Sequence, residues 1–381
     1  MRLIDHIPEW KTALLYYLYR LKPIDKHKIV FCNYNGKGYG CNPKYIAEEM
    51  IKRHPDWDYV WLVGNDNMVF PKEIRTVKYD SKESIYELAT AGVWIDNQRK
   101  LWFHRKRKKQ FFVETWHGAG IIVKKIGADN PNNFVNKPYE HTSKHMNKIA
   151  NIMISDSDSA TEIFHRAFLY DKEVVTCGYP RNDILIGDVS KYEKKIRKEL
   201  NLDPDDKLVL YAPTYRNGRK LDKYDIDCKK VLNALKERFG GNWKMLFRLH
   251  PSMRQKSKDI SYIDDVIDVS LYEDMQELMA GSDVLISDYS SVITEFGFMK
   301  KPIFLFATDI EDYSHERDFY CDYFGLPFSI AENNETLEKN ILEFKSEGYP
   351  ESIDKCFEQY GVKENGNASA TVVDIIENAI K

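Results

Sequence analysis

Two histidines stand where they can exchange protons with a substrate. His117 follows the apolar run 111–114 and precedes Gly118, and His250 follows the run 244–249. An imidazole titrates near pH 6.5, so it can accept or donate a proton near neutral pH. An isolated histidine more often has a structural role. For His117, the position after a strand and the neighbouring glycine favour catalysis, because parallel sheets bind ligands at the carboxyl ends of their strands.

Three arginines follow other strand-like runs. Arg181 lies in a Gly-Tyr-Pro-Arg turn, Arg216 follows Thr214 in a Pro-Thr-Tyr-Arg turn, and Arg248 stands two residues before His250. The planar guanidinium group binds phosphate oxygens in pairs. Each turn taken singly is an ordinary strand end. Together they indicate a polyanionic ligand.

A hydroxyl-rich turn, Asp288-Tyr289-Ser290-Ser291, follows the apolar run 283–287 and precedes a short helical pattern. Free backbone N–H groups, the positive end of the helix dipole and hydroxyl donors together make an anion site at such a turn. The alternative is that the two serines only cap the helix. The arginines elsewhere in the chain favour phosphate binding.

Length and composition limit the class of protein. A chain of 381 residues is expected to form about two domains. Its net charge of −3 provides no overall positive field for nucleic acid. The six cysteines are scattered without a Cys-x-x-Cys pair, which indicates reduced thiols rather than disulfides or a zinc site. Neither a membrane span nor a signal peptide is recognisable, so we expect the protein on the cytoplasmic side.

Apolar strand-like runs alternate with helical patterns, which predicts parallel sheets built from strand–helix–strand units. We expect two Rossmann-like, doubly wound domains facing a central cleft, residues 1–186 and 187–381, divided by the charged segment 187–206. Ser159 and Glu162 form a capping-box pattern that predicts a helix start. The expected strands are 28–33, 59–63, 92–95, 109–114, 149–154, 173–176, 207–211, 244–249, 266–268, 283–287 and 302–305, and the expected helices include 43–53, 81–91, 159–168 and 192–200.

Two further segments leave alternatives open. The glycine-rich loop 36–40 is either a flexible turn or a place where an acceptor approaches the backbone closely. Lys124 and Lys125 either balance phosphate charge or belong to a solvated helix face.

A basic segment, 99–109, interleaves lysines and arginines with Trp102 and Phe103. Nucleic acid is not expected, and the two remaining readings are a solvated loop and a contact with anionic lipid headgroups. We prefer the lipid contact, in which the two aromatic rings insert at the membrane interface. The N-terminal segment 7–21 either lies on the same surface or packs as a helix on the first domain.

Six motifs occur in a fixed order between about residues 28 and 310: Asn42-Pro43-Lys44-Tyr45-Ile46, Trp116-His117-Gly118, Gly178-Tyr179-Pro180-Arg181-Asn182-Asp183, Ala212-Pro213-Thr214-Tyr215-Arg216, Arg248-Leu249-His250-Pro251 and Asp288-Tyr289-Ser290-Ser291. Together they resemble the CDP-glycerol glycerophosphotransferase family of wall teichoic acid and capsule synthesis. The resemblance implies a GT-B fold, a CDP-glycerol or CDP-ribitol donor, and a lipid-linked glycan acceptor met at the cytoplasmic face of the membrane by a peripheral protein.

The resemblance also implies roles for individual residues. His117 is the expected base, and His250 is expected to meet charge at the reacting phosphoryl group. No metal and no cofactor are expected, because arginines and a helix start can neutralise the pyrophosphate. Ala119-Gly120 stands where family members often carry Thr-Pro, which concerns donor or acceptor specificity. The residues expected around the donor are Gly118, Arg181, Thr214, Arg216, Arg248, Asp288, Ser290, Ser291 and Glu295, the last at the ribose hydroxyls.

The expected reaction is attack of an acceptor hydroxyl on the donor phosphorus that carries the polyol, glycerol in the first instance, with release of CMP. Two other classes remain: a nucleotide-sugar glycosyltransferase or epimerase of the same fold, and a non-catalytic nucleotide-polyol or lipid-binding protein.

Overall fold

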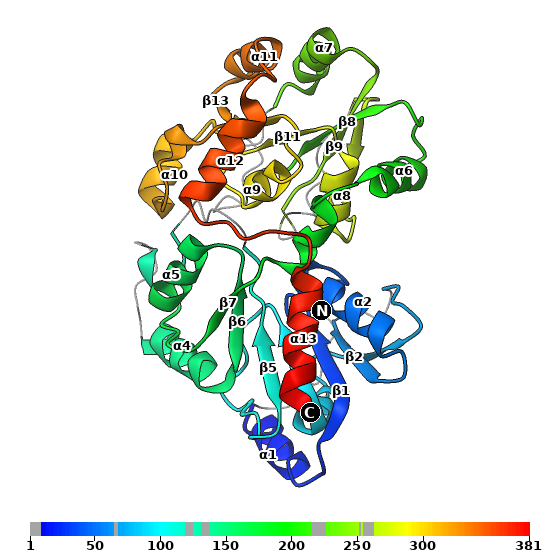
Figure 1. The fold of residues 1–381 in the computed structure, drawn as a ribbon, viewed down its shortest axis with the longest axis vertical. Coiled ribbons are helices and arrows are strands. Elements are labelled where there is room, and N and C mark those ends of the chain that lie inside the picture. The colour runs from blue at the N-terminus through cyan, green and yellow to red at the C-terminus, as the bar shows by residue number, and fades with distance from the viewer. Residues whose placement is uncertain are drawn as a thin grey trace.

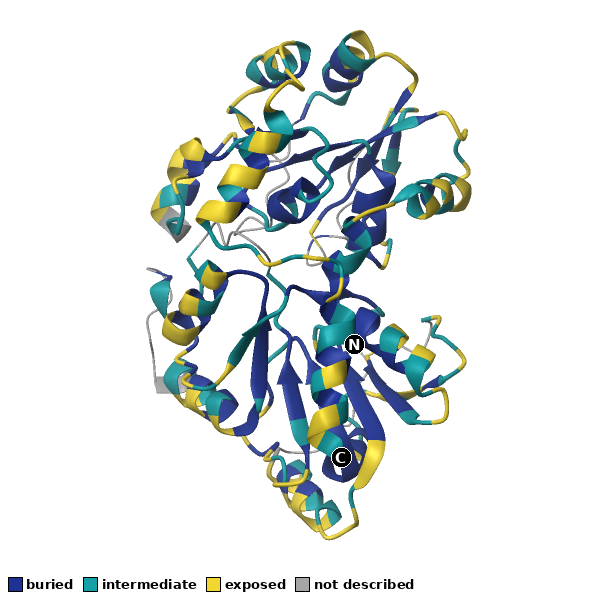
Figure 2. Ribbon diagram, in the orientation of Figure 1, coloured by how far each residue is buried: buried dark blue, intermediate teal, exposed yellow. Residues whose placement is uncertain are grey.

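The computed structural model describes residues 9–64, 68–118, 125–130, 137–214, 226–250, 253 and 263–381, which form two α/β domains stacked end to end (Figure 1). Each domain has one parallel β-sheet with apolar clusters on both faces. The strands are largely buried, whereas the outward faces of the helices are exposed (Figure 2). The predicted fold class, two doubly wound domains, is confirmed.

The first sheet, as far as the structure describes it, has seven strands in the order β3-β2-β1-β4-β5-β6-β7. All pairs of neighbours are parallel. The strands are β1 (Asp25–Cys32), β2 (Asp58–Val63), β3 (Ile74–Lys78), β4 (Ala91–Asp96), β5 (Phe111–Glu114), β6 (Ile152–Ser155) and β7 (Val174–Thr176).

The second sheet has six described strands in the order β10-β9-β8-β11-β12-β13, again all parallel. Both sheets reverse their strand order beside the central strand, as nucleotide-binding sheets do where they place the ligand. The strands are β8 (Lys207–Tyr211), β9 (Trp243–Phe247), β10 (Val266–Asp268), β11 (Val284–Ser287), β12 (Ile303–Phe306) and β13 (Ser329–Ala331).

Helices cover both faces of each sheet because consecutive strand residues point to opposite sides. The helices of the first domain are α1 (Glu9–Tyr19), α2 (Cys41–Arg53), α3 (Lys82–Thr90), η1 (Gly127–Asp129), α4 (Lys137–Ile149), α5 (Asp158–Ala167) and η2 (Pro180–Leu185). In the second domain and beyond follow α6 (Ser190–Glu199), α7 (Cys228–Phe239), α8 (Met275–Gly281), α9 (Val292–Gly297), α10 (Ile310–Arg317), η6 (Tyr323–Gly325), α11 (Asn334–Leu342), α12 (Tyr349–Gln359) and α13 (Ala368–Ile380).

Most expected strands and helices are present within a few residues. The edge strands β3 and β13 had not been predicted; β3 is mostly exposed and β13 has three residues, so neither shows a clear apolar pattern. The predicted helix start at Ser159 is wrong. Ser157 is the N-cap of α5, and its hydroxyl accepts the N–H of Ala160 at 3.0 Å.

The last helix, α13, returns to the first domain, although the division predicted from the sequence put residues 187–381 together. Val372, Val373 and Ile376 are fully buried in the apolar cluster formed with α2 and the first sheet. Asp183 in η2 accepts the N–H groups of Ala368 at 2.9 Å and Ser369 at 2.8 Å. These two bonds satisfy orphan donors at the start of the helix.

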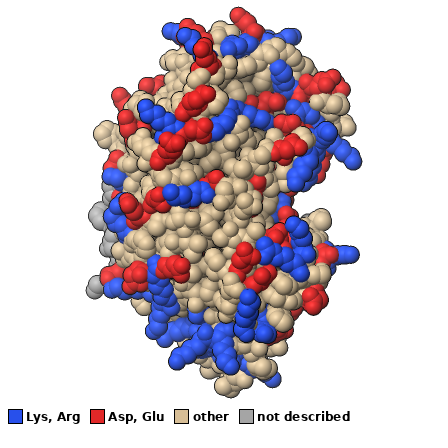
Figure 3. All heavy atoms as spheres, viewed as in Figure 1, with Lys and Arg blue, Asp and Glu red and all other residues tan. Residues whose placement is uncertain are grey.

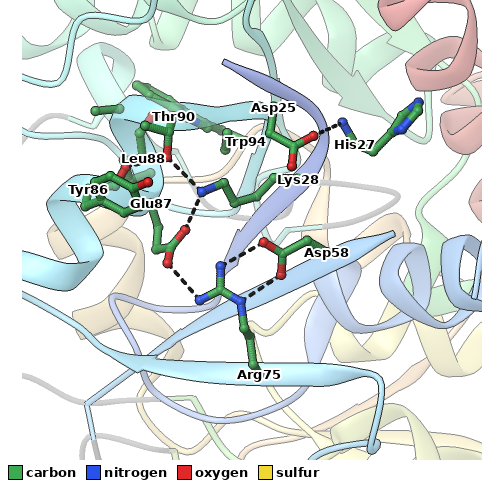
Figure 4. A network of polar contacts seen from close by, with 12 residues as sticks. Asp25, His27, Lys28, Asp58, Arg75, Tyr86, Glu87, Leu88, Thr90 and Trp94 are labelled. Carbon is green, nitrogen blue, oxygen red and sulfur yellow. Dashed lines mark hydrogen bonds and ion pairs between the residues drawn. The ribbon is translucent and has the colours of Figure 1, made fainter. Parts of the chain in front are cut away.

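An ionic network, buried at Lys28 and Glu87 and exposed at Arg75, joins strands of the first domain to α3 (Figure 4). Lys28 of β1 donates to Glu87 and to Thr90, each at 2.8 Å. Arg75 of β3 bonds both oxygens of Asp58 on β2, at 2.7 and 2.8 Å, and reaches Glu87 at 2.7 Å. Burial raises the pKa of Glu87, but the hydrogen bonds from Arg75 and Lys28 outweigh burial and leave it lowered. The edge strand β3 is therefore held by charge in addition to the apolar packing of Ile74.

We expect Glu87→Ala to lower the free energy of unfolding by about 3–5 kcal/mol, because it leaves Lys28 buried without its carboxylate partner. Denaturant unfolding followed by circular dichroism measures this loss. The matched control is Glu83→Ala on the exposed side of the same helix, which should change stability by less than about 0.5 kcal/mol. Equal effects of the two variants would contradict the structural role of the network.

Candidate active site between the domains

The carboxyl ends of the strands in both sheets face the boundary between the domains. Residues just beyond these ends reach across it: Arg181, after β7, contacts Glu295 of α9 in the second domain. Lys44 of α2 contacts Asp274 at 2.6 Å and Glu277 at 2.9 Å, both from the second domain. The surface is hollowed between the two lobes, visible at the right edge of Figure 3. Strand ends beside a hollow define the candidate site.

His117 is held by the chain that follows β4. Its Nδ1 lies 2.9 Å from the carbonyl oxygen of Asn97. A carbonyl only accepts hydrogen bonds, so Nδ1 carries the proton and, in the neutral imidazole, Nε2 presents a lone pair. The ring also lies 4.0 Å from that of Trp116 and 5.0 Å from that of Tyr34, measured between centroids. The tautomer required of a base at Nε2 is thus set by the fold.

Gly118 follows directly, and a Cβ atom there would come within 3.3 Å of the Trp116 indole nitrogen. Ala119 and Gly120, which bear on specificity, lie outside the described residues, as does Lys124. Lys125 forms an ion pair with Asp318 of the second domain, and its backbone N–H donates to the Asp318 carbonyl at 3.0 Å. Lys125 therefore joins the domains rather than belonging to a solvated helix face.

Arg181 is buried and paired. One guanidinium nitrogen donates to Glu295 at 2.6 Å and another to the Cys41 sulfur at 3.2 Å. Its backbone N–H donates to Asn42 at 3.2 Å. The pair spans the two domains, and the donor contact predicted for Arg181 stays a prediction.

Glu295 uses both carboxylate oxygens within the protein. Oε1 accepts from Arg181 and from the Ser291 hydroxyl at 3.0 Å, and Oε2 accepts from Gln276 at 2.5 Å. Burial raises its pKa, and Arg181 opposes that rise. The ribose contact expected for Glu295 would have to compete with these three donors.

Ser290 and Ser291 precede α9, which starts without a side-chain cap hydrogen bond. Ser291 is turned to Glu295 instead. The capping alternative raised from the sequence is therefore not what the structure shows. Ser290 remains partly exposed at the strand end.

Asp288, which follows β11, forms hydrogen bonds to the residue that follows β8 in the second domain. Its carboxylate accepts the backbone N–H of Thr214, which follows β8, at 2.9 and 3.1 Å, and also the Thr214 hydroxyl. The N–H of Tyr289 donates to the same carboxylate at 2.7 Å. The structure thus brings together Thr214 and Asp288, two of the residues expected around the donor. Arg216 lies outside the described residues.

Arg248 is a buried cation held by backbone. Its guanidinium donates to the carbonyl oxygens of Tyr272 at 2.6 Å and Val269 at 3.4 Å. Burial lowers its pKa to about 10, which still leaves it charged at neutral pH. A desolvated positive charge suits an anionic ligand. His250, two residues later, is exposed.

Tyr34 is a site residue that the sequence reasoning missed. Its ring lies against His117, and its hydroxyl is 3.9 Å from the Cys41 sulfur. Burial of the hydroxyl raises its pKa, and the charge of Arg181 acts in the opposite direction. Tyr34 and Asn97 follow β1 and β4, so the strand-end argument used for the histidines and arginines would have found both.

The loop between β1 and α2 contains glycines because other parts of the protein approach its backbone closely. Asn33 donates to the carbonyls of Lys37 at 3.1 Å and Gly38 at 3.3 Å, and it accepts from Asn97 at 2.7 Å. A Cβ atom at Gly38, whose φ is +90°, would come within 2.8 Å of Glu273 in the second domain. The loop therefore passes directly under the other domain.

In the part of the chain that the structure describes, no group of three or more His, Cys, Asp or Glu side chains could hold a metal ion. The same described residues include no helix long and apolar enough to cross a membrane.

Two parallel-sheet domains joined at their strand ends make this a GT-B-type fold. Crystal structures of the wall teichoic acid polymerase TagF match it with a TM-score of 0.84 at 33% identity, over 98% of this chain and 94% of that chain. Another TagF structure, matched equally well, was obtained after a soak with CDPG.

The sequence profile of the CDP-glycerol:poly(glycerophosphate) glycerophosphotransferases matches residues 14–378. The chain belongs to this family. It is 34% identical to a teichoic acid poly(glycerol phosphate) polymerase of Staphylococcus epidermidis over 93% of its own length, but it spans only 51% of that relative. It is 30% identical to a teichoic acid glycerol-phosphate transferase of Staphylococcus aureus, over 92% of this chain and 93% of that one.

Replacing Ser290 and Ser291 together by alanine should weaken binding of CDP-glycerol by about 1.5–3 kcal/mol if their hydroxyls meet a charged pyrophosphate. Calorimetric titration beside a melting curve measures both quantities. Ser81→Ala is the control, because Ser81 does cap its helix, α3, by accepting from Ser84 at 3.1 Å; it should cost about 1 kcal/mol of stability and leave affinity unchanged. An unaltered dissociation constant in the double variant would remove the serines from the donor site.

Proposed function

We propose that this chain transfers glycerol phosphate from CDP-glycerol to a hydroxyl group of a lipid-linked teichoic acid or capsule acceptor and releases CMP. Family membership and the names of its relatives support the chemistry and the polyol. The observation that carries the proposal is the Nδ1–Asn97 hydrogen bond of His117, since it leaves Nε2 as a base at the strand ends that face the second domain.

The reaction proceeds by in-line displacement at phosphorus. The acceptor hydroxyl gives its proton to His117 Nε2 while its oxygen forms a bond to the β-phosphorus of the donor. The bond from that phosphorus to the CMP oxygen breaks, and the electron pair leaves with CMP. A positioned general base contributes about 10²–10⁴-fold to such a step.

Charge that gathers on CMP and on the transferred phosphoryl group needs positive partners. Arg248, His250, Arg216 and the turn at Ser290 and Ser291 are assigned to this task. Arg248 suits it best of the described groups, because its charge is already desolvated and oriented by two carbonyls.

The rival functions differ in the nucleotide they produce. A nucleotide-sugar glycosyltransferase or epimerase would act on a UDP-linked substrate, and a binding protein would release no nucleotide. Assaying nucleotide products across CDP-glycerol, CDP-ribitol and UDP-linked sugars therefore separates all three and also decides the polyol.

We expect His117→Ala to reduce CMP release from CDP-glycerol at least ~10²-fold while donor affinity changes little, because the lost group acts on the acceptor. His27→Ala is the control: His27 is exposed and stacks on Trp57, with ring centroids 4.8 Å apart, so turnover should be preserved. A folded His117→Ala protein with near-normal turnover would remove the base assignment.

A lipid-linked acceptor requires contact with a membrane, and the end of the first domain that carries α1 offers a surface for it. We define the α1 surface by its exposed apolar side chains: Trp10, Leu14, Tyr17, Leu18, Leu21, Leu101 and Trp102. Lys and Arg side chains gather at the same end of the molecule (Figure 3). Apolar side chains ringed by basic ones suit an anionic lipid interface.

The structure corrects parts of the predicted lipid contact. Phe103 is 1% exposed, and Lys100 is buried in an ion pair with Asp96, so neither can reach lipid. Arg107 donates to the Lys22 carbonyl at 2.7 Å. Within segment 7–21, residues 9–19 form the helix α1, which packs on the first domain and also exposes an apolar face. The packing alternative is confirmed, and the membrane contact stays a prediction.

The α1 surface lies at the end of the first domain that is remote from the second domain (Figure 1). An eight-residue strand such as β1 spans about 25 Å. An acceptor anchored in lipid must therefore extend over roughly that length to reach His117.

Replacing the exposed residues Arg105, Lys108 and Lys109 by glutamine should release the protein from vesicles that contain anionic lipid, at about 1 kcal/mol per charge, while turnover on a soluble acceptor persists. Sedimentation with vesicles at low salt and near 1 M salt, where the Debye length is about 3 Å, measures binding. The control replaces exposed Lys229, Lys236 and Lys345 of the second domain. If vesicle binding changes neither with salt nor in the Arg105, Lys108 and Lys109 variant, the α1 surface is an ordinary solvated surface.

A further inference from the structure

A small cavity lies directly behind the loop that carries His117. Its volume is about 30 Å³, enough for about two water molecules. Within the described part of the chain, three buried oxygens have no hydrogen-bond partner and belong to residues that line it: Glu114 Oε2, Ser143 Oγ and Tyr170 Oη. Most of the other lining side chains are apolar.

The other oxygen of Glu114 contacts the loop that carries His117, the proposed base. Oε1 accepts the backbone N–H of Trp116 at 3.1 Å. On the far side of the same residue, Asn42 donates to the Trp116 carbonyl at 3.2 Å. The N–H and the carbonyl of Trp116 are thus bonded to the side chains of Glu114 and Asn42, and not to the backbone of a helix or strand.

Trp116 needs this support because its backbone is strained. Its φ of +49° lies in the left-handed region, which costs a non-glycine residue about 1–2 kcal/mol. Such a conformation persists only where surrounding contacts enforce it. It turns the chain sharply after β5, and the next residue is His117, whose Nδ1 meets Asn97.

We propose that Glu114 is a positioning residue for His117, holding Trp116 in the left-handed conformation through its N–H and thereby orienting the imidazole. This inference rests on the proposed function only for its activity readout.

Burial raises the pKa of Glu114 to about 8, with Asp96 adding to the rise and Trp116 N–H, Lys100 and Arg99 opposing it. The group is therefore mostly neutral at pH 7. A neutral acceptor holds the loop without placing a negative charge behind the base, which would favour the imidazolium form. Tyr170, across the cavity, also has its pKa raised, chiefly by burial.

Two substitutions separate the hydrogen bond from acidity. Glu114→Gln keeps the length and the acceptor oxygen but cannot ionise. Glu114→Met has a similar length but no acceptor, so Trp116 N–H loses its partner. Tyr170→Phe is the control, since it alters the same cavity and leaves the loop bond intact.

Two readouts are taken: kcat and KM for CMP release, and the tautomer and pKa of His117 from ¹⁵N NMR of histidine-labelled protein, assigned with His117→Ala. We expect Glu114→Met to lower kcat about tenfold or more with little change in donor KM, and to disturb the His117 tautomer. Glu114→Gln should stay within about threefold of the native kcat and keep the native imidazole signals, as should Tyr170→Phe.

An active methionine variant with native His117 signals would overturn the proposal. So would equal loss in the glutamine and methionine variants with an unchanged imidazole, because the ionisable group and not the hydrogen bond would then matter. If Glu114→Met does not fold, Glu114→Leu, which also lacks an acceptor, takes its place under the same expectations. Should His117→Ala retain turnover, the assignment of the base fails, whereas the NMR readout still decides whether Glu114 positions His117.

Discussion

The buried pair between Arg181 and Glu295 is the contact on which the arrangement of the site depends. It joins a turn of the first domain to α9, the helix of the second domain that follows the turn at Ser290 and Ser291. Removing one member of such a pair typically costs about 3–5 kcal/mol, since the other charge remains buried. The two side chains therefore hold the domains in one relative orientation.

Contacts extend from this pair to the loop that carries His117 in the first domain and to the serine turn in the second. On one side, Asn42 accepts the N–H of Arg181 and donates to the carbonyls of Thr115 and Trp116, next to His117. On the other, Ser291 and Gln276 converge on Glu295. A displacement of either domain would change the base loop and the serine turn together, so the geometry of the site is set across the boundary and not within one sheet.

Much of this could be read from the sequence because parallel sheets impose two simple regularities. Buried strands carry continuous apolar runs, and polar groups with a function follow their carboxyl ends. The positions of His117, Arg181, Thr214, Arg248 and Asp288 after their strands were predicted in this way, and their contacts with a ligand stay predictions.

The sequence did not reveal which polar side chains pair with one another. Arg181 and Glu295 are separated by more than a hundred residues, and local pattern carries no information on such a contact. Composition misled in the basic segment for the same reason: Lys100 looks like a surface charge until Asp96, at the end of β4, is seen beside it. The edge strand β3 was missed because Ile74 is its only buried residue, so it shows no apolar stripe, and its ion pairs are made with distant residues.

The return of α13 to the first domain has a consequence for how the chain folds during synthesis. The first sheet is complete once β7 has emerged from the ribosome, yet part of the apolar cluster on one face comes from Val372, Val373 and Ile376. The whole second domain is made in between and can fold as an independent unit, since its sheet contains residues 207–331 only. Until α13 has been synthesised, the nascent first domain exposes an apolar strip over α2 and the sheet, and it stays incomplete in any product truncated before residue 368.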